Sequence, residues 1–143
     1  MIGYITFRLG DRQLACRLDQ VREVVRLDGL DVLPGMTPPI TGLLELRGDP
    51  LPVVDLRGSS DAGSRGDVLV MAAGIDAIGA IVDQVAAVHD EDELVSSGER
   101  PAGLPNYVID VLRYARASTG LTSTGRAGPV LLVDLQALLL VAV

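Results

Sequence analysis

Short segments of alternating apolar and polar residues run along this chain, and glycines separate many of them. In residues 4–9, Ile5, Phe7 and Leu9 share one face, which is typical of a strand with one buried side. A turn at Gly10 and a returning strand over residues 13–18 follow. The first part of the chain is therefore predicted to form a β-hairpin.

The chain also contains a weak internal repeat. A glycine precedes each of two Asp-Gln-Val-x-x-Val elements, at residues 19–24 and 83–88, by the same spacing. A further match pairs residues 52–56 with residues 129–135. Two matches in the same order favour two copies of one supersecondary unit. Each Asp-Gln-Val element is compatible with a helical turn capped by its aspartate and also with a bulged strand.

The remaining pattern predicts an all-β fold. Further strands are expected over residues 40–46, 51–56, 68–73, 77–82, 107–114 and 130–133. Asp134 is expected to cap a short final helix that runs through Leu140. Residues 58–66 have the composition of a flexible linker, and residues 115–128 that of a mobile loop. Many short strands with glycine turns are typical of barrels and sandwiches.

Length and charge narrow the classes of partner. The 143 residues suit one domain, or two small lobes that share a core, and 48% of them are apolar. The net charge is −7, and all twelve basic residues are arginine. This balance argues against a nucleic-acid surface and against an anionic membrane surface. The N-terminal residues do not resemble a signal peptide, and the apolar run 137–143 is far shorter than the ~20 residues of a membrane span. A cytoplasmic protein without membrane insertion is expected.

Candidate chemistry is sparse, and we predict no catalytic residue, cofactor or metal site. Cys16 is the one cysteine, so it cannot form an intrachain disulfide and is expected to be a buried, inert thiol. His89 is the one histidine and adjoins the acidic run 90–93, which is interpreted as a solvated surface turn. Three aspartates follow apolar strands, where they usually cap turns rather than pair for acid–base catalysis: Asp55, Asp83 and Asp134. The chain is therefore not expected to be an enzyme.

One segment favours recognition over catalysis. Residues 42–57 are predicted to form two strands joined by a Gly48-Asp49 turn, with Arg47 at the end of the first strand. Arginine is enriched at interface hot spots, so Arg47 is a candidate partner contact as well as a possible ordinary surface residue. Val21 and Glu23 carry the same two interpretations: partner contacts, or a core valine and a solvated glutamate.

These segments resemble the CheW-like domain family. The sequence Gly-Leu-Leu-Glu-Leu-Arg-Gly at 42–48, followed by Pro-Val-Val-Asp-Leu-Arg at 52–57, is similar to the family's Gly-x-x-Asn-Leu-Arg-Gly…Pro-x-Val-Asp-Leu-Arg signature. Residues 7–11 and 21–25 resemble its opening hairpin and Val-x-Glu-Ile element, and residues 78–85 resemble its Val-Gly-x-x-Val-Asp-x-Val segment. The resemblance runs from about Phe7 to Leu139, which is nearly the whole chain.

The resemblance implies a fold and a function. The family consists of adaptors that join the cytoplasmic tips of chemoreceptors to the histidine kinase CheA. The implied fold is two SH3-like five-stranded β-barrels that share a hydrophobic core, with short helical elements including a C-terminal helix. Residues 1–143 would form a single domain, with the first barrel at about 10–57 and the second at about 67–135. The receptor-binding groove carries over to Val21, Glu23, Gly42, Arg47 and Gly48. The kinase contact would use the barrel ends.

One departure keeps alternatives open. The family's usual asparagine before Leu-Arg-Gly is Glu45 here, which places a negative charge two residues from Arg47. This change is compatible with a divergent regulatory or self-assembling module in a non-standard chemosensory system. A small ligand-binding barrel is the alternative from another class, and a deep polar pocket would favour it.

Overall fold

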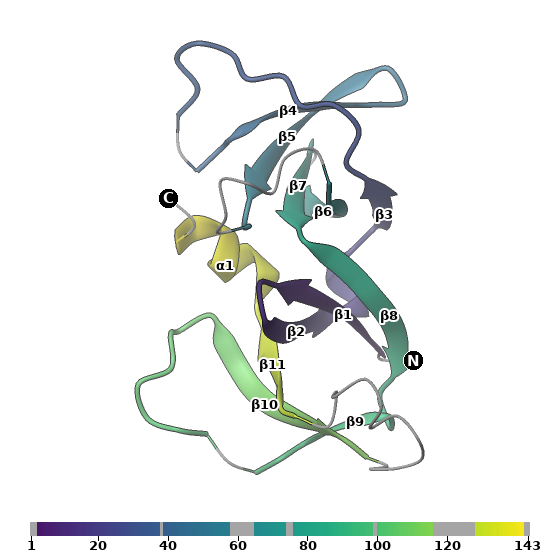
Figure 1. The fold of residues 1–143 in the computed structure, drawn as a ribbon, viewed down its shortest axis with the longest axis vertical. Helices are drawn as coiled ribbons and strands as arrows, with labels where there is room; N and C mark the ends of the chain where they lie inside the picture. The colour runs from purple at the N-terminus through teal and green to yellow at the C-terminus, as the bar shows by residue number, and fades with distance from the viewer. Residues whose placement is uncertain are drawn as a thin grey trace.

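Two curved β-sheets make up most of this computed structural model, which describes residues 3–37, 39–57, 65–73, 76–98, 100–115 and 128–141 (Figure 1). The six-stranded sheet has the order β8 (Gln84–Asp90), β1 (Gly3–Leu9), β2 (Arg12–Arg17), β11 (Val130–Val133), β10 (Val108–Tyr114) and β9 (Leu94–Ser96). The five-stranded sheet has the order β3 (Glu23–Arg26), β6 (Asp67–Ala73), β7 (Asp76–Val82), β5 (Asp49–Asp55) and β4 (Gly42–Leu46). The predicted all-β fold with a C-terminal helix is confirmed, and the two expected five-stranded barrels are present as two curved sheets that form half-barrels. One sheet has a sixth strand, the short β9, which was not predicted.

Each sheet combines strands from both parts of the chain. The predicted hairpin β1–β2 pairs with β8 on one side and, in parallel, with β11 on the other. The predicted hairpin β6–β7 pairs with β3 on one side and, in parallel, with β5 on the other. Strands β6 and β7, from the segment expected to form the second barrel, therefore lie in one sheet with β3, β4 and β5. Each of the two sheets needs residues from both copies of the repeat.

The two Asp-Gln-Val elements fold differently. The first contains the 3-10 helix η1 (Leu18–Gln20), and β3 follows it. The second continues as strand β8, whose register with β1 shifts between Thr6 and Phe7. Each of the two expected conformations is thus found once. Neither aspartate caps a helix: no side chain caps η1, and Asp83 accepts a 2.8 Å hydrogen bond from the N–H of Gly10 instead.

One hydrophobic core joins the two sheets. Its buried members come from β1 and β2 (Ile5, Phe7, Leu14, Cys16), from β5, β6 and β7 (Val54, Leu69, Met71, Ala80, Val82), and from β10, β11 and the helix (Val108, Val133, Leu135, Leu138, Leu139). The thiol of Cys16 is buried as predicted, and this burial, together with the charge of Asp19, raises its pKa to about 12. The shared core that the resemblance implied is therefore present.

The helix α1 (Leu135–Val141) closes the described part of the chain against this core. Asp134 caps it as predicted, because its Oδ1 accepts a 3.2 Å hydrogen bond from the N–H of Gln136. The side chain of Gln20 donates to the same oxygen at 3.2 Å, which ties η1 to the start of the helix. Within the described ranges, no helix is long and apolar enough to cross a membrane. Most of the predicted linker and of the predicted loop, residues 58–64 and 116–127, lies outside the described residues.

Candidate partner-binding site

The β4–β5 hairpin presents Arg47 on a tight turn. Arg47 and Gly48 form the turn with φ angles of 51° and 87°, and Leu46 pairs with Asp49. The predicted Gly48-Asp49 turn is one residue too late, because Asp49 already belongs to β5. A two-residue hairpin turn with two positive φ values matches the right-handed twist of the flanking strands. In the described part of the chain, Arg47 is the one non-glycine residue in this left-handed region.

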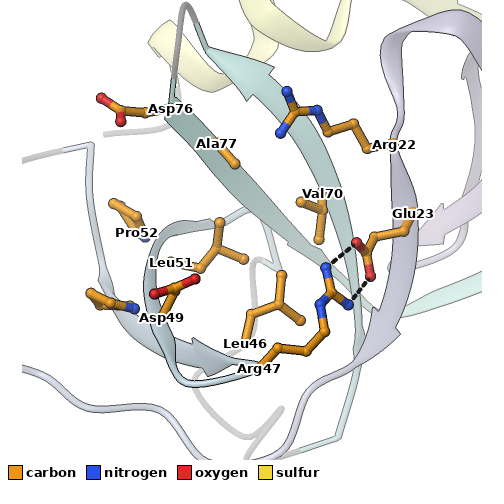
Figure 2. A pocket seen from close by; sticks show the side chains of 11 residues that line it. Arg22, Glu23, Leu46, Arg47, Asp49, Leu51, Pro52, Val70, Asp76 and Ala77 are labelled. Atoms are coloured by element: carbon orange, nitrogen blue, oxygen red, sulfur yellow. Dashed lines mark hydrogen bonds and ion pairs between the residues drawn. The ribbon is translucent and has the colours of Figure 1, made fainter.

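The side chain of Arg47 is bound to Glu23. Its two terminal nitrogens donate hydrogen bonds of 2.8 and 2.7 Å to the two carboxylate oxygens (Figure 2). Because β3 and β4 are the two edge strands of the five-stranded sheet, this ion pair connects opposite edges of the curved sheet. The hydrogen bonds from Arg47 lower the pKa of Glu23, and those to Glu23 raise the pKa of Arg47. The side chain of Arg47 is 68% exposed and that of Glu23 is 32% exposed, so the guanidinium remains accessible to a partner.

A surface hollow of about 480 Å³ adjoins this pair. Leu51 and Val70, which are buried, and Leu46 and Ala77, which are half-buried, supply its apolar surface (Figure 2). The full lining is Arg22, Glu23, Leu46, Arg47, Asp49, Pro50, Leu51, Pro52, Val70, Asp76 and Ala77. The hollow therefore has apolar surface at its base and charged residues around it, as a site for a protein segment would require.

Two of the predicted site residues lie away from this hollow. Gly42 is buried at the far end of β4, where an added Cβ would lie 2.8 Å from Leu30 Cδ1 and 2.9 Å from the carbonyl oxygen of Asp31. Val21 follows η1 and packs, half-buried, against the core that joins the sheets. The structure thus brings Glu23 and Arg47 together, with Gly48 beside them. Gly42 and Val21 lie instead in the structure that supports this pair.

Sequence reasoning missed several residues that line the hollow. Arg22 lies next to Glu23, and Asp49 lies next to Gly48. Both of these neighbours had been singled out by the motifs. Asp76 had no local signal, because it enters the site only through the pairing of β7 with β5. A pairing prediction between the two copies of the repeat could have found it.

The other candidate groups take part in structural contacts. The side chain of His89 is only 14% exposed, so it is packed rather than solvated like the acidic run beside it. Its Nδ1 lies 3.2 Å from Glu93 Oε2, its Nε2 lies 3.3 Å from Thr6 Oγ1, and its ring meets Tyr114 edge-on. Asp55 forms an ion pair of 2.8 Å with Arg57. Among the described residues, His, Cys, Asp and Glu side chains form no group that could hold a metal ion.

The family model of the CheW-like domain matches residues 3–142. This chain belongs to the CheW-like domain family. The match covers both sheets, the Arg47–Glu23 pair and the hollow, so every element of the candidate site lies within the CheW-like domain. No curated protein matches the chain.

A solved protein structure has a similar fold. The crystal structure of the scaffolding protein TtCheW from Thermoanaerobacter tengcongensis matches with a TM-score of 0.67 and 21% sequence identity. The match covers 96% of this chain and 86% of that chain. The CheW-like fold is therefore shared over nearly the whole length, at a low level of sequence identity.

Proposed function

We propose that this protein is a non-enzymatic adaptor that couples chemoreceptors to a CheA-type histidine kinase. Membership of the CheW-like family supports this role, and the structurally similar TtCheW is described as a scaffolding protein. Its partners would be the cytoplasmic tip of a chemoreceptor and the kinase. It would act in the cytoplasm, recruited to receptor arrays at the membrane.

The observation that carries the proposal is the Arg47–Glu23 pair beside an open hollow with an apolar base and charged residues around it. Two charge-assisted hydrogen bonds fix the guanidinium in one orientation before a partner arrives. Such preorganisation reduces the side-chain entropy that is lost on binding. Glu23, Arg47 and Gly48 would contribute the contact surface, while Gly42 and Val21 would hold β4 and the start of β3 in place.

Coupling would arise from differential binding. A receptor that favours one conformation of the bound adaptor also changes how tightly that adaptor holds the kinase, because linkage between the two sites is reciprocal. This role requires two binding surfaces and no chemical step.

Arg47 can act by contacting the receptor directly or by closing the sheet through Glu23. Exchanging the charges of Arg47 and Glu23 distinguishes these two roles. If Arg47 contacts the receptor directly, Arg47→Glu should weaken binding roughly thirtyfold or more, the scale of an interface hot spot. The exchange variant Arg47→Glu/Glu23→Arg should then fail to restore binding. If Arg47 mainly closes the sheet through Glu23, the exchange variant should recover most of the affinity.

The test measures binding of the cognate receptor tip fragment and the cognate kinase to the wild-type protein and to each variant. Arg12→Glu is the matched control, since Arg12 is an exposed arginine in another hairpin. Absence of binding to both the receptor fragment and the kinase by the wild-type protein would overturn the adaptor proposal. Detection of a self-assembled species in that case would support the self-assembling alternative.

A further inference from the structure

We infer that the hollow receives an apolar side chain of the partner that is flanked by a basic residue. This inference rests on the proposed function and specifies the chemistry of the partner at the same site. It follows from the distribution of apolar and charged groups around the hollow.

The base of the hollow has a small apolar surface that suits an aliphatic side chain. Leu51 and Val70 present aliphatic surface there, and Pro50 and Pro52 extend it along β5. The volume of about 480 Å³ lies within the range of pockets that hold small ligands, so it has room for a side chain. Covering this surface with an aliphatic side chain removes apolar area from water, whereas a polar side chain would lose hydrogen bonds.

The charges around the hollow favour a basic residue next to the partner's apolar side chain. The guanidinium of Arg47 and the carboxylate of Glu23 satisfy each other. Asp49 and Asp76 are exposed, and neither has an ion-pair partner in the part of the chain that the structure describes. Figure 2 shows both aspartates on the side of the hollow away from Arg22. Asp49 also helps to raise the pKa of Arg47, yet the lining as a whole has three acidic residues against two arginines. A lysine or arginine of the partner would therefore meet exposed carboxylates and an excess of one negative charge there.

The long side chain of a basic residue also suits this geometry. Its methylene groups can lie along Pro50 and Pro52 while its charged end reaches Asp49 or Asp76. An acidic residue at the same place would face two like charges, and such juxtaposition disfavours the wrong partner. The acidic side of the hollow thus works as a specificity element.

Two capped dipeptides provide a direct probe: N-acetyl-leucyl-arginine amide and N-acetyl-leucyl-glutamate amide. Their binding to the full chain is followed by ¹H–¹⁵N NMR shifts of the Leu46, Leu51 and Ala77 amides. The arginine dipeptide should bind about two- to fivefold more tightly than the glutamate dipeptide, as expected for exposed ion pairs. Asp49→Asn/Asp76→Asn should abolish this preference, and Asp11→Asn, a change at an exposed aspartate in the β1–β2 turn, should keep it. Arg22→Glu should increase it.

Equal binding of the two dipeptides, or shifts that avoid these amides, would overturn the inference. The same variants are then tested with the cognate receptor fragment and kinase. If a wild-type partner binds and Asp49→Asn/Asp76→Asn leaves its affinity unchanged, the inference fails and the adaptor function stands. If the dipeptide preference is present and neither partner binds, the inferred chemistry of the hollow stands and the adaptor function fails.

Discussion

Arg47 and Glu23 lie 24 residues apart in the chain, yet their side chains join the two edge strands of the five-stranded sheet through two hydrogen bonds. A second link between these regions is the bridge in which Asp31 pairs with Leu43. The signature arginine therefore has a partner within its own fold. Loss of Arg47 consequently has structural effects that must be separated from effects on binding.

Comparison of two substitutions at Arg47 separates its side-chain role from its backbone conformation. Both Arg47→Ala and Arg47→Gly remove the ion pair, but only glycine adopts a φ of 51° without steric cost. We expect Arg47→Gly to be more stable than Arg47→Ala by about 1 kcal/mol. Thermal or urea unfolding measures this difference. An alanine variant as stable as the glycine variant would show that the turn relaxes to negative φ.

The Glu23–Arg47 pair should make stability depend on acidic pH. The hydrogen bonds from Arg47 lower the pKa of Glu23 in the folded state below its unfolded value, which is roughly 4.3. The pair's stabilising contribution is therefore present above that unfolded value and is lost as pH falls through the lower folded pKa. The melting temperature of Glu23→Gln should lie below that of the wild-type protein at neutral pH, and the difference should shrink as the pH falls below the unfolded value of Glu23.

Salt provides the control for this pH experiment. Because the pair is largely exposed, raising the ionic strength to about 1 M should shrink the difference at neutral pH. A difference between Glu23→Gln and wild type that persists unchanged across the acidic range would mean that it arises from packing and not from charge.

Gly42 should be required for folding rather than for direct contact with a partner. A Cβ at this position would lie within 3 Å of Leu30 and of the Asp31 carbonyl, so Gly42→Ala should destabilise the fold by about 1–3 kcal/mol. Gly128→Ala is the matched control, because nothing lies within 4 Å of an added Cβ there, and it should stay within ~0.5 kcal/mol of wild type. Chemical denaturation measures both variants. Unchanged stability of Gly42→Ala combined with lost receptor binding would instead favour a contact role.

The pairing between the two parts of the chain predicts that neither part folds alone. A fragment of residues 1–62 contains β1 and β2 without their partners β8 and β11, and it contains β3, β4 and β5 without β6 and β7. We expect this fragment, and the fragment 63–143, to show poor NMR dispersion and no cooperative melting. An equimolar mixture should recover the spectrum of the intact chain. A well-dispersed, cooperative fragment 1–62 would contradict this prediction.

Local strands could be predicted from the sequence where one face is buried along the whole segment. The predicted strand at 130–133 coincides with β11, and the strand at 107–114 begins one residue before β10. Strand β9 could not be predicted, because it has three residues and only Leu94 is buried. It forms because β10 offers a free edge to it. The parallel pairings β2–β11 and β5–β7 likewise join segments that are far apart in the sequence and leave no local pattern.

The candidate site could be predicted only in part for the same reason. The signature segment and the Val-x-Glu element pointed separately to Arg47 and Glu23, but their hydrogen bonds depend on how the sheet curves. Gly42 was named through the motif, and its physical role became clear only from the close approach of Leu30. Asp76 contributes to the hollow through pairing between β5 and β7, so a reading of single segments could not identify it.

The order of strands in the two sheets has a consequence for synthesis on the ribosome. All strands of the five-stranded sheet lie between Glu23 and Val82, so this sheet can assemble once that part of the chain has emerged. The six-stranded sheet must wait for β11, because Leu14 of β2 pairs with Leu131. During that interval β8 can pair with β1, but the β2 side of the hairpin has no strand beside it and its apolar face has no complete core to cover it. The first hairpin to be made is thus among the last to be completed, and long-range pairing of this kind is slow.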